Sequence, residues 1–242
     1  MFRIKICGIT NVADAIAAVD AGADAIGLNF YEKSPRCVSV FVARRISDAT
    51  CDADSRVGLV YPTGVFVNHT AEEVCRIVYV ARLIIAQLHG DEPPSMIGEL
   101  HGKLHDIPVV RVHRLERVDF EAIANDLKAC REAAATARFE IVSPCGVLVD
   151  AASAGVYGGA GKTLPWQELA DHHQWLGDTP LVLAGGLTPE NVFEAIRIVR
   201  PAAVDVASGV EFSTGKKDPV KVRDFVAAAR AAFDSIQGER GA

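Results

Sequence analysis

Two short segments near the end of the chain combine an apolar strand pattern with small residues, an arrangement that suits phosphate binding. They span 183–192 and 205–211, and each leads from the strand pattern into a helix pattern. Glycine lets backbone N–H groups approach an anion closely, and the N-terminus of a helix adds partial positive charge. In a barrel of eight βα units, the loops after strands seven and eight often hold a ligand phosphate in this way. We therefore predict a phosphate-bearing substrate, held by backbone groups around Gly185, Gly186, Ser208 and Gly209.

Cys7 and Asp150 each end an apolar strand pattern, where barrel enzymes place their reactive groups. A thiol accepts a proton once its pKa is lowered, and a partly desolvated carboxylic acid with a raised pKa donates one. Beside a sugar phosphate, this pair suits proton removal next to a carbonyl or iminium carbon, with protonation of a departing oxygen. Taken alone, each also fits a structural role: a small buried hydrophobe for the cysteine, and a cap or turn residue for the aspartate.

Strand and helix patterns alternate along the chain and predict eight βα units. A capping box at Thr70 and Glu73 marks one helix start, and Thr188–Pro189 and Asp218–Pro219 mark two others. The predicted strands are 3–7, 25–30, 64–68, 83–88, 108–113, 146–150, 181–185 and 203–207.

The length and composition agree with one large α/β domain. The chain has 242 residues, close to the roughly 250 that are typical of a (β/α)8 barrel. Half of the residues are hydrophobic, as expected for parallel strands that are buried on both faces. We predict a single (β/α)8 TIM barrel, with residues 1–242 forming one catalytic domain.

Two segments allow more than one interpretation. The chain from Ser47 to Arg56 is polar and loop-like, and both 57–61 and 64–68 then have strand character. We expect the second of these runs to be the third strand. Within 138–145, residues 139–142 also fit a short strand ahead of the sixth.

Charge and segment patterns exclude several classes of protein. The formal net charge of -6 argues against nucleic acid or an anionic membrane as a partner. The chain starts with a strand pattern rather than a signal peptide, which predicts a cytoplasmic protein, and no apolar run approaches the roughly 20 residues of a membrane span. The cysteines contain no C-x-x-C pair and predict neither a zinc site nor a disulfide framework; they are Cys7, Cys37, Cys51, Cys75, Cys130 and Cys145.

Seven groups of residues, in order along nearly the whole chain, resemble the phosphoribosylanthranilate isomerase family of tryptophan biosynthesis. Any one group is weakly specific, whereas all seven in order are highly specific. They are Lys5–Thr10, Gly27–Arg36, Gly64–Asn68, Gln87–Gly90, Leu148–Asp150 with Tyr157–Thr163, Ala184–Asn191, and Asp205–Glu211 with Gly215–Asp218.

This resemblance implies an Amadori rearrangement of N-(5-phosphoribosyl)anthranilate, without a metal or cofactor. By position, Cys7 corresponds to the general base that removes the ribose C2′ proton, and Asp150 to the general acid that protonates the furanose ring oxygen. Arg36 is expected to pair with the anthranilate carboxylate, for which a planar guanidinium is suited. The expected partner is a small phosphoribosyl substrate, and the expected assembly is a monomer or homodimer.

Four positions depart from the family pattern. Leu164–Pro165 precedes a tryptophan where an aspartate and an aromatic residue are usual, and Ala160 replaces a common hydroxyl residue. Asn29 places a polar side chain in the second strand, where an apolar one is frequent.

Two other functions fit parts of the sequence. A related barrel isomerase of histidine biosynthesis uses two aspartates, so Cys7 counts against that interpretation. A phosphate-binding barrel that has lost catalysis is disfavoured because Cys7, Asp150 and Arg36 are all present. Turnover of freshly made phosphoribosylanthranilate separates these functions from the first.

Lys5 should face the barrel interior if Cys7 does, because side chains alternate along a strand. A buried ammonium needs a partner, and closure of a barrel sets the last strand beside the first. Asp205 is the only carboxylate in 203–207. We predict a Lys5–Asp205 ion pair beneath the site, whose cationic end helps to lower the pKa of Cys7.

Two histidine positions lie outside this set. His89 ends the fourth strand and fits either a ligand contact or a hydrogen-bonded structural role. His172–His173 lies in a polar helical stretch and is expected at the surface, without a metal.

Overall fold

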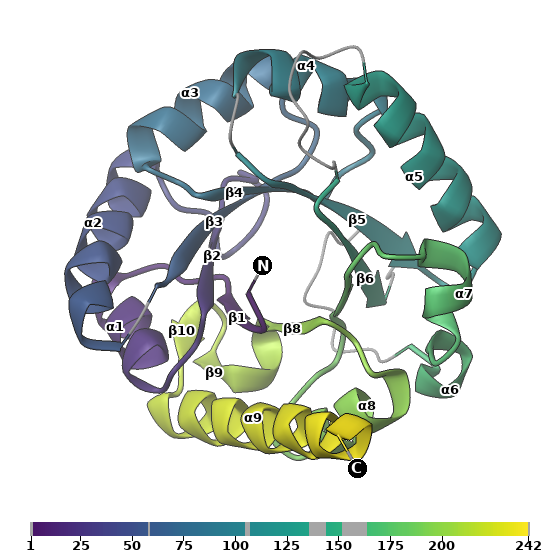
Figure 1. Cartoon of the computed structure of the whole chain (residues 1–242). Coiled ribbons are helices and arrows are strands. Elements are labelled where there is room, and N and C mark those ends of the chain that lie inside the picture. Colours follow the sequence, from purple (N-terminus) through teal and green to yellow (C-terminus); the bar gives the residue numbers. More distant parts are fainter. Residues whose placement is uncertain (1, 58, 105–106, 136–143, 152–163, 242) are drawn as a thin grey trace.

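The computed structural model describes residues 2–57, 59–104, 107–135, 144–151 and 164–241. Within these residues, eight parallel strands close into a barrel in chain order (Figure 1), which confirms the predicted fold class. The strands are β1 (Ile4–Cys7), β2 (Ala25–Asn29), β3 (Tyr61–Phe66), β4 (Ile85–Leu88), β5 (Val109–Leu115), β6 (Gly146–Ala151), β7 (Leu181–Leu183) and β8 (Ala203–Val206).

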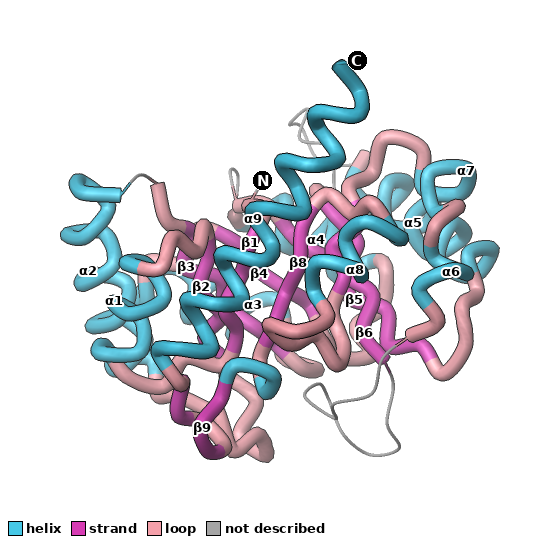
Figure 2. The backbone as a smooth tube through the Cα atoms, turned by 90° about the horizontal axis from the view of Figure 1, so that it is seen from below, coloured by secondary structure: helices cyan, strands magenta, loops and turns pink. Residues whose placement is uncertain are grey.

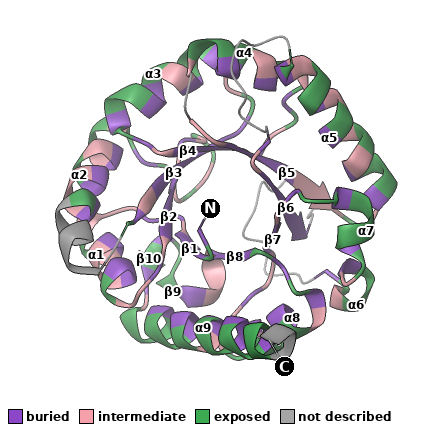
Figure 3. Cartoon of the chain, viewed as in Figure 1, coloured by how far each residue is buried: buried purple, intermediate pink, exposed green. Residues whose placement is uncertain are grey.

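Helices form a ring around the barrel, with their buried faces turned toward the strands and their exposed faces outward (Figure 3). A short 3-10 helix, η1 (Ser208–Val210), follows β8 and leads into a small antiparallel hairpin of β9 (Glu211–Ser213) and β10 (Lys216–Lys217). The α-helices are α1 (Val12–Asp20), α2 (Val40–Val57), α3 (Ala71–Ala81), α4 (Ser95–Lys103), α5 (Phe120–Ala134), α6 (Trp166–Leu169), α7 (His172–Leu176), α8 (Val192–Val199) and α9 (Pro219–Gly241).

Alternation along the strands divides the core into two parts. Outward-facing strand residues pack against the helices in the larger apolar cluster. Inward-facing residues fill the barrel interior, where a smaller cluster includes Ile85, Val110, Leu148, Val182 and Ala203. The polar side chains on this inward face are therefore held in place by packed apolar neighbours.

The loop prediction for Ser47–Arg56 was wrong, because α2 continues to Val57. Ile46, Ser47 and Thr50 are all buried, so one face of this helix points inward even where the sequence is polar. On the other face, Arg44 forms an ion pair with Asp48 one turn later, at 2.8 Å. Helical spacing of polar residues was therefore misinterpreted as a loop.

The third strand overlaps the predicted run 64–68 but begins earlier, at Tyr61, and so crosses Pro62. Proline has no N–H, which usually excludes it from the interior of a sheet. Here the missing N–H would point toward β4, and β4 begins only opposite Thr63. The alternative strand 57–61 is wrong apart from its last residue, and the alternative at 139–142 lies outside the described residues.

Two of the three predicted helix starts are confirmed. The capping box of α3 is complete, with Thr70 Oγ1 accepting from the Glu73 N–H at 3.3 Å and the Glu73 carboxylate accepting from the Thr70 N–H at 2.9 Å. Asp218 caps α9 by accepting from the Val220 N–H at 2.9 Å. Thr188–Pro189 instead forms a turn, and α8 begins at Val192, because Asn191 turns its side chain back to the Thr188 N–H.

Closure of the barrel joins the two ends of the chain. β1 pairs with β8, and Lys5 lies directly opposite Asp205 in that register. β9 lies at the end of the barrel away from the chain's N-terminus (Figure 2), on the side where the carboxyl ends of the strands open. This is the end at which barrel enzymes carry their sites.

None of the helices among the described residues has both the length and the apolar character that a membrane crossing requires.

Candidate active site

A cavity of about 690 Å³, open to solvent, lies at the carboxyl ends of the strands. It brings together every residue that the sequence proposed for the site, although they come from opposite ends of the chain. Those residues are Cys7, Arg36, Asp150, Gly185, Gly186, Ser208 and Gly209. The matching segment Tyr157–Thr163, with Ala160, lies outside the described residues.

Lys5 and Asp205 form the predicted ion pair beneath this cavity, with Lys5 Nζ 2.9 Å from Asp205 Oδ2. Lys5 is fully buried, and its Nζ also donates to Gln87 Oε1 at 2.7 Å. Burial disfavours the ammonium, but Asp205 and Cys7 more than compensate and raise the pKa of Lys5. The lysine is therefore a fixed positive charge below the reactive thiol.

Cys7 shares the cavity wall with Asp150 and is partly accessible from it. Burial, and secondly the charge of Asp205, raise the pKa of the Cys7 thiol above its ordinary value. Lys5, Lys217 and Arg36 act in the opposite direction. Lys5 thus acts to lower the pKa of Cys7, as expected, but in the ligand-free protein the opposing effect of burial is larger.

Arg36 reaches the cavity as part of an ion-paired cluster that includes Glu211 and Lys217. Its Nε and Nη2 each lie 2.7 Å from one carboxylate oxygen of Glu211, and Lys217 Nζ lies 3.1 Å from Glu211 Oε1. Burial opposes ionisation of Glu211, but Arg36 and Lys217 outweigh it and lower the pKa of the carboxyl group. Within the described part of the chain, these two contacts leave both Nη1 protons and one Nη2 proton of Arg36 at the end of the guanidinium as hydrogen-bond donors.

The segment that carries Arg36 is held by Asn29, one of the departures from the family pattern. Asn29 Oδ1 accepts from the Tyr31 N–H at 2.8 Å, and its Nδ2 donates to Ser34 Oγ at 3.2 Å. Ser34 Oγ in turn accepts from the Arg36 N–H at 3.2 Å. Gly8 makes room for the arginine, because a Cβ there would lie 2.5 Å from Arg36 Cδ.

The two small-residue segments meet at one side of the cavity. Gly185 and Gly186 have φ values of 87° and 62°, which other residues adopt only with strain. A Cβ at Gly209 would lie 1.9 Å from the Leu187 carbonyl oxygen, so the two loops touch backbone to backbone. Asn191 fixes the first loop by donating from Nδ2 to the Gly186 carbonyl at 3.0 Å.

His89 lies in the cavity wall, 3.5 Å from Asp150 Oδ2 through Nε2. This position agrees with a contact to a ligand and also with a hydrogen-bonded structural role, the two alternatives predicted for His89. The surface prediction for His172 was wrong: the side chain is buried and its Nδ1 lies 3.0 Å from the Leu169 carbonyl, whereas His173 is exposed. Burial lowers the pKa of His172 to about 4.

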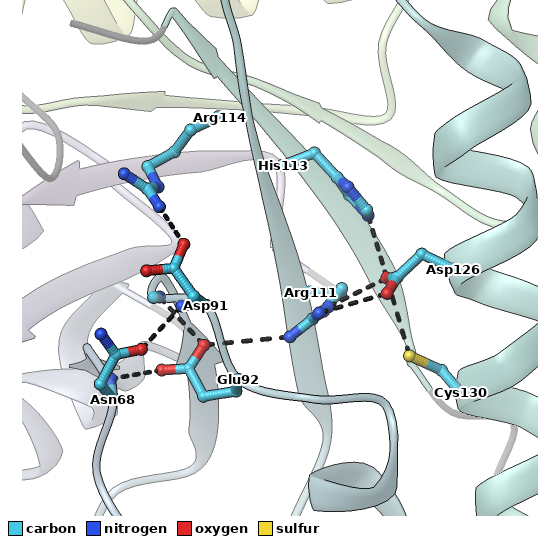
Figure 4. A network of polar contacts seen from close by, with 9 residues as sticks. Asn68, Asp91, Glu92, Arg111, His113, Arg114, Asp126 and Cys130 are labelled. Carbon is cyan, nitrogen blue, oxygen red and sulfur yellow. Dashed lines mark hydrogen bonds and ion pairs between the residues drawn. The ribbon is translucent and has the colours of Figure 1, made fainter. Parts of the chain in front are cut away.

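A second polar network joins the loops that follow β3 and β4 to β5 and α5 (Figure 4). The Glu92 carboxylate accepts from the N–H groups of Asn68 and Gly90, at 2.7 and 3.0 Å, and so joins the loops that follow β3 and β4. Arg111 lies between Glu92, at 3.9 Å, and Asp126 of α5, at 3.0 Å. The loop after β4 is thereby tied to an outer helix.

Sequence reasoning assigned no role to Gln87, Glu211 or Lys217, although all three lie in the matched segments. Gln87 is two residues from His89 on the same strand pattern, so alternation alone would have placed it on the inward face. Glu211 and Lys217 are brought to Arg36 by the β9–β10 hairpin, which no pattern in the sequence predicted.

The comparisons with known proteins agree with this geometry. A family model described as N-(5'phosphoribosyl)anthranilate (PRA) isomerase matches residues 4–228. The N-(5'-phosphoribosyl)anthranilate isomerase of Acidithiobacillus ferrooxidans is 45% identical over 230 residues, which cover 95% of this chain and 98% of that protein.

Solved structures are similar over the same length. Phosphoribosyl anthranilate isomerase from Thermotoga maritima has a TM-score of 0.76 and 35% identity, with 96% of this chain and all of that one covered. A structure of the isomerase in complex with reduced 1-(o-carboxyphenylamino)-1-deoxyribulose 5-phosphate has a TM-score of 0.73 and 34% identity, with the same shares covered. The chain belongs to the N-(5'-phosphoribosyl)anthranilate isomerase family.

Proposed function

We propose that this protein converts N-(5'-phosphoribosyl)anthranilate to 1-(2-carboxyphenylamino)-1-deoxyribulose 5-phosphate, with Cys7 as general base and Asp150 as general acid. The observation that carries the assignment is the shared cavity. A thiol, a carboxyl group, a guanidinium and two glycine-containing loops surround one space at the carboxyl ends of the strands.

The proposed reaction needs a proton donor at the furanose ring oxygen and a proton acceptor at C2′, and both of these atoms are bonded to C1′. Asp150 gives its proton to the furanose ring oxygen as the bond from C1′ to that oxygen breaks, which leaves a protonated Schiff base. The Cys7 thiolate then removes the C2′ proton to give an enolamine. Return of a proton to C1′ and loss of the C2′ hydroxyl proton produce the ketone, so that the overall reaction is an isomerisation.

Substrate binding is assigned to the two ends of the cavity. The Gly185–Gly186 loop and the Ser208–Gly209 turn offer backbone N–H groups for the phosphate, as their glycine conformations allow a close approach. The free end of the Arg36 guanidinium is suited to the anthranilate carboxylate, because Glu211 holds the opposite edge. The substrate is a small molecule that spans these two anion sites.

The direct test is the decay of anthranilate-type fluorescence after phosphoribosylanthranilate is made in the assay mixture with the protein present. We expect decay in excess of the spontaneous rate, also after treatment with EDTA. The ribonucleotide isomerised in histidine biosynthesis serves as the comparison substrate. Turnover of that compound alone, or binding of phosphate ligands without turnover of either, would contradict the proposal.

The roles of the two reactive residues are tested by Cys7→Ser and Asp150→Asn. A positioned acid or base contributes roughly 10² to 10⁴ in rate, so each variant should lose at least that factor in kcat. Circular dichroism and the unfolding midpoint establish that the fold is retained. A folded variant within about tenfold of wild type removes that residue from its assigned role.

A further inference from the structure

Gln87 and His89 link the two reactive sides of the cavity through an unbroken row of buried polar atoms. Lys5 Nζ lies 2.7 Å from Gln87 Oε1, and Gln87 Nε2 lies 2.9 Å from His89 Nδ1. On the other side of its ring, His89 Nε2 lies 3.5 Å from Asp150 Oδ2. Gln87 is fully buried and His89 is 8% exposed, so water does not replace these contacts freely.

The donors and acceptors in this row can be assigned by elimination. An ammonium only donates hydrogen bonds, so the Gln87 atom that faces Lys5 must be the amide oxygen. The Gln87 NH₂ group then faces His89, and since this group only donates, His89 Nδ1 must accept. A neutral imidazole with an accepting Nδ1 carries its proton on Nε2, which is the nitrogen that faces Asp150.

The two oxygens of Asp150 consequently lie in different surroundings. Oδ2 faces Nε2 of His89 at 3.5 Å, and this nitrogen has no hydrogen-bond partner among the described residues. Oδ1 lies toward Gly185 of the cavity wall, where an added Cβ would lie 3.0 Å from it. The separation of 3.5 Å is long for a hydrogen bond, and such contacts commonly tighten when substrate binds.

We propose that His89 is a positioning residue for Asp150. The Lys5–Gln87 pair holds His89 in the neutral form that carries its proton on Nε2. Because this N–H faces Oδ2 of Asp150, the transferable proton of Asp150 is carried on Oδ1. The inference rests on the proposed role of Asp150 as the acid. When Oδ1 gives its proton to the ring oxygen, His89 keeps its own proton and donates to the carboxylate that has formed. A hydrogen bond to a charged acceptor is about twice as strong as one to a neutral acceptor, so this contact favours the proton transfer.

The tautomer is tested by ¹⁵N NMR of histidine-labelled, ligand-free protein at pH 7.5. The chain has seven histidines, and the signals of His89 are those that the His89→Gln variant lacks. We expect ring shifts of an Nε2–H tautomer. In Gln87→Glu, a carboxylate replaces the amide and accepts from both sides, so the proton should appear on Nδ1. A wild-type ring protonated at Nδ1, or an unchanged ring in Gln87→Glu, would overturn the proposal.

Kinetics test the consequence for Asp150. His89→Phe keeps a ring but removes the N–H, and we expect kcat to fall about 10- to 100-fold, the loss of one charge-assisted hydrogen bond, with KM within threefold of wild type. His89→Gln retains a donor near Asp150 and should recover most of that loss. A fall in His89→Phe that His89→Gln does not relieve would contradict the positioning role.

The control is His101→Gln, which replaces a buried histidine on α4 whose Nε2 also has no hydrogen-bond partner in the described part of the chain. We expect unchanged kinetics in this variant. Failure of the present inference can be separated from failure of the proposed function. The NMR result is obtained without substrate, and full activity of Asp150→Asn would remove the acid role whatever form the His89 ring takes.

Discussion

In its proposed role as general base, Cys7 must be ionised, whereas burial raises the pKa of its thiol. Three cations oppose the effect of burial, and the nearest in sequence is Lys5, whose side chain lies below it on the same face of β1. Asp205 neutralises much of the Lys5 charge but also fixes its place. The reactivity of one thiol is thus set by the balance of a small charged cluster.

Lys5→Met should move the acidic limb of the kcat/KM pH profile to higher pH. The limb follows ionisation of the base, and removal of a cation makes the thiolate less favourable, so the apparent pKa rises. Measurement of kcat/KM between pH 6 and 10 checks this shift. Lys216→Met, at an exposed lysine of β10, serves as the control; a limb that stays in place in Lys5→Met would exclude the lysine from this role.

Arg36→Met should act on binding rather than on the proton transfers. We expect substrate affinity to fall by about 1.5–3 kcal/mol, the usual contribution of a charge-assisted hydrogen bond. Lys217 still pairs with Glu211 in this variant, so the carboxylate is not left alone. Isothermal titration with a phosphoribosylaniline, which lacks the carboxylate, should give equal affinities for both proteins. If this analogue loses as much affinity as the substrate, Arg36 does not bind the carboxylate.

The loops that follow β7 and β8 act as one unit, because the backbone of Gly209 packs against the Leu187 carbonyl. The positive φ values of Gly185 and Gly186 shape the first loop, and Asn191 fixes it to the turn before α8. The geometry of the proposed phosphate site therefore depends on close backbone contact between two loops.

Gly209→Ala should disrupt that contact. An added Cβ would lie 1.9 Å from the Leu187 oxygen, so the backbone must shift. A displacement of about 1 Å in a substrate-positioning element can cost about 10²-fold in rate, and we expect KM and the inhibition constant of inorganic phosphate to rise together. Gly102→Ala in α4 is the matched control, since a Cβ there meets nothing within 4 Å. Unchanged phosphate inhibition in Gly209→Ala would place the phosphate elsewhere.

Elements with one strong local signal were predictable, and elements shaped by distant partners were not. The capping box at Thr70 and the cap at Asp218 act within one helical turn, so the sequence contains the whole cause. The polar half of α2 is helical with Ser47 and Thr50 on a buried face, and β3 extends across Pro62 because β4 begins late.

The same distinction holds for the site. Alternation and barrel closure were enough to predict the pairing of Lys5 with Asp205. The contacts of Glu211 with Arg36 and Lys217 required the β9–β10 hairpin, and Arg36 lies 175 positions before Glu211 in the chain. Small changes in loop direction decide such contacts, and single-sequence patterns do not record them.

At the scale of the whole molecule, a partly buried cluster of charges connects β5 of the barrel to α5. Asp126 of α5 accepts from Arg111 at 3.0 and 3.2 Å and lies 3.3 Å from His113 (Figure 4). Burial opposes ionisation of Asp126, but His113 and Arg111 outweigh it and lower its pKa well below the ordinary value. A carboxyl group whose pKa is lower in the folded state stabilises the fold above its unfolded pKa, and this contribution is lost as the pH falls.

Asp126→Asn should therefore reduce the free energy of unfolding most at neutral pH. We expect a loss of about 1.5–3 kcal/mol at pH 7, and the difference from wild type should narrow by about 1 kcal/mol at pH 3, where the unfolded carboxyl group is already protonated. Urea unfolding at the two pH values measures both quantities. Asp234→Asn, at an exposed position on α9, controls for general charge effects. A difference that does not change with pH would mean that ionisation of Asp126 is not its cause.

The pairing of β1 with β8 also cannot form until β8 has been synthesised. Lys5 and Asp205 are 200 residues apart in the chain, so a ribosome that adds about 5–20 residues per second needs roughly 10–40 s between them. Throughout that interval the first strand has no neighbour on its open edge, and its lysine must stay hydrated rather than enter the interior. The surroundings of the Cys7 thiol are therefore completed only after β8 has been translated, and a nascent chain released earlier has Cys7 without the cavity that β8 helps to form.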